Sequence, residues 1–158
     1  MKQLKNLSIF MLVALMAATF ASCSKDDDDA NFDLNSYIIG TWHSYKATIY
    51  IQGGPYSGKS ADIEVNKTGQ YSQSYVEFTF KDGGQMRMGA FQKDDNGIIN
   101  WTEENGTYYI SGDIITLRDN DGETVNIVFD PKNKDLCIQG TGVDSEGTPY
   151  KTTAYLKK

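Results

Sequence analysis

One stretch of this sequence has the spacing of a nucleotide-binding loop. Residues 53–60 read Gly-Gly-Pro-Tyr-Ser-Gly-Lys-Ser and satisfy G-x-x-x-x-G-K-[ST], in which backbone amides cradle phosphates and the lysine reaches them. That chemistry requires a helix to open directly after the loop, so that its N-terminal amides face the phosphate. Residues 61–65 instead alternate apolar and polar side chains, as a strand does. We therefore interpret 53–60 as a flexible, glycine-rich hairpin loop.

A second stretch partly fits a calcium-binding loop. Counted from Gln92, residues Asp94, Asn96, Gly97 and Glu103 stand at the third, fifth, sixth and twelfth places of such a loop. The first place lacks a carboxylate and the flanks alternate like strands, so an oxygen cage would lack both its leading ligand and its helical scaffold. We interpret 94–97 as a hairpin turn and predict no metal site.

Few side chains offer acid–base or nucleophilic catalysis. His43 is the only histidine, and it follows Trp42 directly, which places it on the outer face of a strand. Cys137 stands between apolar residues, and no second histidine exists to activate it. The carboxylates gather at turns, where Asp is common for backbone reasons. A glycosidase pair among them stays open, because their separation cannot be read from sequence. We predict neither enzyme activity nor a cofactor.

The first 22 residues have the pattern of a signal peptide. Lys2 and Lys5 precede an uncharged run from Leu7 to Phe20, which ends in small residues before Cys23. The pattern resembles a bacterial lipoprotein signal and implies that Cys23 is acylated, for example with palmitate, as the first residue of the mature chain. An ordinary secretory signal with an incidental cysteine is the alternative.

An acidic tether follows the cysteine. Lys25 leads into Asp26, Asp27, Asp28 and Asp29, a block of like charge that favours an extended, solvated chain. The block resembles the acidic run that marks lipoproteins of one Gram-negative phylum for the outer leaflet of the outer membrane. We expect a signal peptide at 1–22, a tether at 23–36 and one domain at 37–158, held at the outer membrane by the lipid on Cys23 and facing outwards.

The charge of the chain disfavours nucleic acid as a partner. The formal net charge is −6, and removal of the two lysines of the signal leaves 13 basic against 21 acidic residues, or −8. Binding through phosphates requires clustered Lys and Arg, which the chain lacks. With Cys23 acylated, Cys137 has no intrachain disulfide partner, so stability must come from the core.

Apolar residues after the tether alternate with period two and never follow helical spacing over ten or more positions. Turn signals, among them Asp82-Gly83-Gly84, Asn105-Gly106 and Asp121-Gly122, separate short runs. Because these connections are short, consecutive strands should be antiparallel neighbours in an all-β, up-and-down barrel. The expected strands are 41–51, 62–65, 75–80, 85–91, 98–103, 107–111, 114–118, 125–129, 136–140 and 150–157.

The start of the first strand carries a family resemblance. Gly40-Thr41-Trp42 resembles the Gly-x-Trp opening of lipocalin-like (calycin) barrels. The resemblance implies a barrel of roughly eight strands, with Gly40 passing beneath the floor and the ring of Trp42 closing it. It also implies that a cation near the end of the last strand, Lys157 or Lys158, packs over that ring.

The same resemblance implies a binding module for a small apolar or amphipathic ligand. On alternation grounds Val76, Phe78, Phe80, Met86 and Met88 would line its interior, although they equally suit a core without a ligand.

The inward face of strand 41–51 has two possible sets of side chains. One register points Lys46 and Tyr50 inwards, and would match an acidic head group; a bulge would point Tyr45, Ala47, Ile49 and Ile51 inwards instead. The alternative function is a ligandless scaffold whose loops bind a protein or glycan through Tyr56, Tyr71, Tyr75, Tyr108 and Tyr109.

Overall fold

The computed structural model describes residues 32–144 and 146–158, and nearly all of its regular structure there is antiparallel β-sheet. The one short α-helix precedes the first strand, and three single 3-10 turns sit in loops. The elements are α1 (Leu34–Ile38), β1 (Gly40–Ile51), η2 (Gly54–Tyr56), β2 (Ser60–Glu64), η3 (Ser72–Ser74), β3 (Val76–Lys81), η4 (Asp82–Gly84), β4 (Gln85–Lys93), β5 (Ile99–Ser111), β6 (Ile114–Asp119), β7 (Thr124–Asp130), β8 (Asp135–Val143) and β9 (Pro149–Lys157).

Eight strands close into the predicted up-and-down barrel. From β3 to β9 each strand pairs with the next, and β1 closes the ring by pairing with both β3 and β9. The all-β antiparallel barrel expected from alternation is therefore confirmed. A ninth strand, β2, pairs only with the second half of β1 and lies outside the closed ring.

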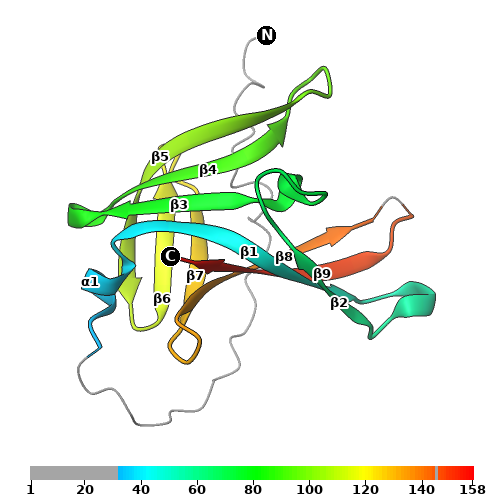
Figure 1. Cartoon of the computed structure of the whole chain (residues 1–158), viewed down its shortest axis with the longest axis horizontal. Coiled ribbons are helices and arrows are strands. Elements are labelled where there is room, and N and C mark those ends of the chain that lie inside the picture. The colour runs from blue at the N-terminus through cyan, green and yellow to red at the C-terminus, as the bar shows by residue number, and fades with distance from the viewer. Residues whose placement is uncertain (1–31, 145) are drawn as a thin grey trace.

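Strand β1 changes neighbours halfway along its length. Residues 40–43 pair with β3, whereas 46–50 pair with β2. The β1–β2 hairpin therefore diverges from β3, and Figure 1 shows it running with β8 and β9 away from the β3–β4–β5 part of the sheet. The turns of the β1–β2, β4–β5 and β8–β9 hairpins all lie at the end of the barrel far from α1 (Figure 1). We call this end the mouth and the α1 end the floor.

A β-bulge at Tyr45 sets which side chains of β1 face inwards. The pairing with β9 shifts between Ser44 and Lys46, which leaves Tyr45 as an extra residue. Trp42 and Ser44 point inwards before the bulge, and Ala47 opposite Ala154 points inwards after it. The strand thus combines the first predicted register with the second, because the extra residue reverses the alternation.

The core fills the barrel from the floor upwards. Inward side chains of seven strands and α1 form one buried cluster, in which Trp42, Ile115, Leu117, Ile127, Leu136 and Leu156 are completely inaccessible to solvent. Burial of this much apolar surface stabilises the fold by roughly 25 cal/mol per Å². A second cluster of Ala47, Val65 and Tyr75 packs where β1 and β2 diverge from β3.

The floor is built from aromatic rings beneath the barrel. The indole N–H of Trp42 donates to the carbonyl of Ile38 at 2.8 Å, which joins α1 to β1. Tyr37 meets Trp42 edge-on with ring centroids 5.7 Å apart, and Phe32 stacks on Phe129 at 5.3 Å. These contacts show that the packed domain begins before Tyr37, so the boundary between tether and domain lies nearer to Phe32 than predicted.

The cation at the floor is Lys158 and not Lys157. Leu156 points inwards, so Lys157 points outwards by alternation, and only the next residue lies beneath the barrel. The Nζ of Lys158 donates to the carbonyl of Tyr37 at 2.9 Å and lies over the Tyr37 ring, not over Trp42. Gly40 is needed here because its φ is +128° and a Cβ would lie 2.7 Å from Lys158 Cε.

The predicted reversal at Asn105-Gly106 is wrong. β5 runs without interruption from Ile99 to Ser111, and Gly106 pairs with Met86 on one side and Asp119 on the other. The glycine allows a close approach of two strands, because a Cβ at this position would lie 2.4 Å from the carbonyl oxygen of Arg118.

In the described part of the chain no helix is long and apolar enough to cross a membrane.

Candidate functional site

The predicted interior residues occupy one compact part of the core. Phe78, Phe80, Met86 and Met88 alternate along β3 and β4, face inwards and are buried together. Phe80 also meets the ring of Tyr108 edge-on, with centroids 4.9 Å apart. These side chains fill the barrel at its floor end. Val76, at the start of β3, is only half-buried and lies toward the mouth.

Inward positions become accessible toward the mouth. Along β9, Leu156 is completely buried, whereas Ala154 and Thr152 on the same face are half-buried. The pattern repeats on β1, where Ala47 is buried and Ile49 and Ile51 are half-buried. The wall that these strands present at the mouth is therefore mainly apolar and partly open to solvent.

Part of this wall could have been found from sequence. Ile49 and Ile51 belong to the bulged register that the sequence allows for β1, whereas Ala154 and Thr152 are not among the predicted interior residues. Alternation back from Leu156 is the signal that identifies Ala154 and Thr152.

Lys46 and Tyr50 lie on the outer face of β1, not inside the barrel. Lys46 pairs with Tyr155 of β9 and Tyr50 with Lys151, both on the face opposite Ala154. The bulge at Tyr45 is the cause, because it shifts these residues by one position relative to the alternation that begins at Trp42. An acidic ligand inside the barrel would therefore not meet Lys46.

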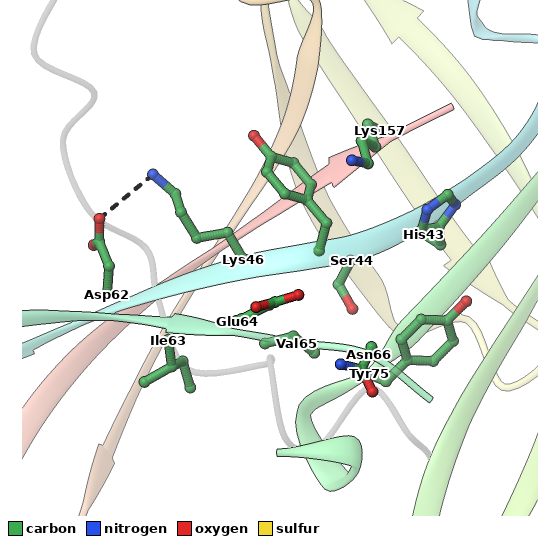
Figure 2. A pocket seen from close by; sticks show the side chains of 11 residues that line it. His43, Ser44, Lys46, Asp62, Ile63, Glu64, Val65, Asn66, Tyr75 and Lys157 are labelled. Carbon is green, nitrogen blue, oxygen red and sulfur yellow. Dashed lines mark ion pairs between the residues drawn. The ribbon is translucent and has the colours of Figure 1, made fainter. Parts of the chain in front are cut away.

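A pocket of about 450 Å³ is lined mainly by side chains of this outer face, and also by Ser44 and Ile63, which point inwards. It is bounded by β1, by β2, by the start of the β2–β3 loop and by Lys157 of β9. Figure 2 shows Lys46 and Asp62 at one side of it, His43 and Tyr75 at the other, and Glu64 between them. No sequence pattern predicts this pocket, because the pocket forms where β1 changes its pairing partner from β3 to β2.

The two lysines that line the pocket each lie over an aromatic ring. Lys46 Nζ lies 3.7 Å from the carboxylate of Asp62 and 4.5 Å from the ring centroid of Tyr155. Lys157 Nζ lies over the ring of Tyr45 at 4.7 Å. The phenol of Tyr45 donates to the carboxylate of Asp135 at 2.6 Å, which fixes the ring.

Three groups at the pocket have shifted proton affinities. The hydrogen bond to Asp135, together with burial, raises the pKa of Tyr45 to about 12. Burial and the nearby charge of Glu77 raise the pKa of Tyr75 to about 12. A hydrogen bond from Thr48 and the charge of Lys46 lower the pKa of Asp62. Both phenols are therefore protonated and Asp62 is ionised at neutral pH.

The sequence profile of the lipocalin-like domain matches residues 38–134, which is more than half of the chain. The chain belongs to the lipocalin-like domain family. Proteins of this family bind small hydrophobic ligands. The family assignment made from Gly40 and Trp42 is confirmed.

Solved structures with a similar fold include two bacterial proteins and one from lobster. A lipocalin-like protein from Bacteroides uniformis is 16% identical, with 77% of this chain and 97% of that chain covered and a TM-score of 0.41. An uncharacterised protein from Bacteroides eggerthii is 13% identical, with coverage of 74% and 98% and a TM-score of 0.37. Lobster apocrustacyanin A1 is 15% identical, with 78% of this chain but only 61% of that chain covered and a TM-score of 0.37. No curated protein matches the sequence.

The motif-like loops of this lipocalin-like domain have structural roles. Residues 53–60 connect β1 to β2 through η2 and lead into a strand. In the β4–β5 turn, the carboxylate of Asp94 accepts from the backbone amides of Asn96 and Ile98 at 2.9 and 2.8 Å. Within residues 32–144 and 146–158 no cluster of three His, Cys, Asp or Glu residues has the geometry to hold a metal ion.

The two candidate catalytic side chains face outwards. His43 pairs with Lys157 on the outer face, and its ring stacks on Tyr75 with centroids 6.5 Å apart. Cys137 is half-buried and unpaired, and burial with the nearby carboxylates of Asp130 and Asp135 raises its pKa to about 11. A thiol with so high a pKa is a poor nucleophile at neutral pH.

The five tyrosines considered for loop binding do not form one surface. Tyr75 is buried beside Val65, and the phenol of Tyr108 donates to the carbonyl of Lys81. Tyr56 and Tyr109 are 59% and 61% exposed, but one lies in the β1–β2 loop and the other beside the β5–β6 turn, at opposite sides of the molecule (Figure 1). Tyr71 is exposed in the β2–β3 loop. Binding of a protein or glycan by the loops therefore stays a prediction.

The predicted lipid-attachment and export residues, Cys23, Lys25 and Asp26 to Asp29, lie outside the described residues.

Proposed function

We propose that this domain binds a small apolar or amphipathic ligand at the mouth of its barrel, and that it does so without catalysis. The observation that carries the proposal is the change in accessibility along the inward face, from completely buried at the floor to half-buried at Ala154, Thr152, Ile49 and Ile51. A scaffold without a ligand gains stability by burying its apolar residues, whereas a binding site must leave some apolar residues accessible to the ligand.

The chemistry of the mouth matches such a ligand. Ile49, Ile51 and Ala154 offer an apolar wall, and Thr152 adds a hydroxyl that reaches the carbonyl of Gly140 at 3.5 Å. The buried methionines Met86 and Met88 lie further toward the floor, where flexible thioether side chains adapt to ligands of different shape. The ligand would therefore rest its apolar part on the core and its polar part toward solvent.

A tryptophan placed at the mouth tests the proposal. Thr152 faces inwards opposite Gly140, which has no side chain, so the indole of Thr152→Trp would project into the mouth. Thr153 is the matched control, because it is the adjacent threonine on the same strand, is also half-buried and faces outwards. The probe is cis-parinaric acid, a fluorescent fatty acid whose emission rises on leaving water.

Thr152→Trp should weaken binding of the probe at least tenfold, while Thr153→Trp should leave it unchanged. Equal affinity for the two variants would place the probe elsewhere on the protein. Absence of binding to the parent protein would exclude an apolar ligand of this size from the mouth.

We also propose that the protein is a lipoprotein of the outer membrane, anchored through the lipid on Cys23 and exported outwards by the acidic run that follows it. The sequence pattern described above supports this. The packing of Phe32 against Phe129 is consistent with it, since this contact places the first described residue at the floor, away from the mouth. The mouth would take up its ligand from the medium.

A further inference from the structure

We propose that the outer pocket is a second binding site and that it takes a small zwitterion, a molecule carrying both an ammonium and a carboxylate group. The mouth wall is formed by Ile49, Ile51, Thr152 and Ala154, and none of them lines the pocket, so this site does not depend on the apolar ligand proposed above. Its volume of about 450 Å³ lies in the range of small-molecule sites, about 300–1,000 Å³.

The β-bulge creates the wall of this pocket. Because Tyr45 is an extra residue, Tyr45 and Lys46 both point outwards, where regular alternation would turn one of them into the core. Tyr45 is held by Asp135, and it supports the ammonium group of Lys157 against its ring. The ammonium group of Lys157 is therefore positioned by the Tyr45 ring, which the hydrogen bond to Asp135 holds in place.

Four charged side chains line the pocket, and only two of them form an ion pair with each other. Lys46 and Asp62 form an ion pair at 3.7 Å. Glu64 stands directly opposite Lys46 in the register of β1 and β2, yet neither Glu64 nor Lys157 takes part in an ion pair with any residue that the structure describes. A carboxylate and an ammonium are thus left at the border of one pocket without a charged partner.

A ligand with both charges satisfies this arrangement better than the alternatives do. Its ammonium would meet Glu64, and its carboxylate would meet Lys157 with the imidazole of His43 beside it, since His43 and Lys157 are directly opposite in the sheet. A simple anion would be repelled by Glu64 and Asp62, and a simple cation by Lys157 and Lys46. The lining carries two lysines and two carboxylates, so its formal charge is zero when His43 is neutral. Because exposed ion pairs are weak, we expect an affinity of about 1 mM.

The test compares zwitterions with analogues that lack one charge. Saturation-transfer NMR would be recorded with glycine, β-alanine and glycylglycine, which separate the two charges by increasing distances. N-acetylglycylglycine removes the ammonium, glycylglycinamide removes the carboxylate, and glucose represents a neutral polar molecule. At least one zwitterion should bind at least tenfold more tightly than all three of these comparison molecules.

Variants then assign the two ends of the ligand. Glu64→Gln and Lys157→Met should each weaken zwitterion binding about tenfold, whereas Lys151→Met, on the same face and strand as Lys157, should not. The double variant Glu64→Lys, Lys157→Glu exchanges the two charges and should restore binding. Thr152→Trp should leave it unchanged, which separates this site from the mouth.

Binding of glucose or of either single-charge analogue as strongly as the zwitterions would overturn the proposal, as would the absence of zwitterion binding. Retention of full affinity in both Glu64→Gln and Lys157→Met would place the bound molecule outside this pocket. None of these results would bear on the apolar ligand, since the mouth is tested separately by comparing Thr152→Trp with Thr153→Trp.

Discussion

Trp42 joins α1 to β1 at the floor through a single side chain. Its ring is fully buried, meets Tyr37 edge-on and donates a hydrogen bond to the carbonyl of Ile38. Truncation would leave a large cavity and one backbone carbonyl without its partner. We expect Trp42→Ala to lower the free energy of unfolding by about 3–5 kcal/mol, measured by urea denaturation.

The other tryptophan is the control for this prediction. Trp101 is half-buried on the outer face, where it packs over Gly89. Trp101→Ala should therefore cost clearly less than Trp42→Ala. Similar losses for the two variants would contradict the role assigned to Trp42 at the floor.

Tyr45 gives the stability of the protein an alkaline limit. Its pKa is about 12 in the folded state against 10.0 for an unperturbed tyrosine, so folding favours the protonated phenol. This contribution is fully present below pH 10 and is lost as the pH rises toward 12, because the unfolded chain ionises first. Tyr45→Phe should reduce the fall of the urea midpoint between pH 10 and pH 12.

The hydrogen bond to Asp135 is the main cause of this shift. Asp135→Asn should therefore move the Tyr45 pKa back toward 10, detected by tyrosinate absorbance at 295 nm as the difference from the corresponding Tyr45→Phe variant. An unchanged titration would assign the raised pKa to burial instead.

At the scale of elements, β5 depends on Gly106. The strand passes so close to β6 that a Cβ on Gly106 would overlap the carbonyl oxygen of Arg118 and the end of Met86. Overpacking of this kind destabilises proteins by about 1–3 kcal/mol, and we expect Gly106→Ala to fall in that range. Thermal unfolding followed by circular dichroism would measure it.

Asn105 provides the matched control, since it is exposed and adjacent on the same strand. Asn105→Ala should change stability by no more than about 0.5 kcal/mol. If both residues formed a type I′ turn, both require positive φ and Asn105→Ala would also be clearly destabilising.

The bulge at Tyr45 is the element that separates the two proposed sites. It turns Ala47, Ile49 and Ile51 toward the mouth and Lys46 toward the outer pocket. One extra residue in one strand therefore gives β1 an apolar inner face and a charged outer face at the same level of the barrel.

At the scale of the whole molecule, attachment to the membrane is predicted to depend on Cys23. Acylation there is the proposed attachment after the signal peptide is removed. Cys23→Ala should therefore release the protein into the soluble fraction of its host, measured by immunoblot after a high-salt wash of the membranes. Continued fractionation of the variant with membranes would contradict the lipid anchor.

Display on the cell surface is a separate prediction. Replacement of Asp26, Asp27, Asp28 and Asp29 by alanine should leave the protein acylated but protect it from protease added to intact cells. Metabolic labelling with a palmitate analogue would control for acylation. Unchanged cleavage by protease would remove the export role of the acidic run.

The sequence determined the architecture because alternation is a local property. Val76, Phe78 and Phe80 on β3, and Met86 and Met88 on β4, face one core as predicted, since two residues apart on a strand means the same face. Short connections then required antiparallel neighbours, and Gly40 and Trp42 gave the family.

Tertiary contacts decided what alternation alone could not. An Asn-Gly pair signals a turn, but at Asn105-Gly106 the approach of β6 demands a glycine within a continuous strand. The bulge at Tyr45, which places Lys46 and Tyr50 outside, depends on pairing with β9, a strand about 100 residues further along the chain. The outer pocket lies where β1 changes its partner from β3 to β2 and where Lys157 is contributed by β9. Such a site is assembled from distant segments, so no local pattern in the sequence predicts it. The barrel, in contrast, is predictable because each strand carries its own alternation of apolar and polar residues.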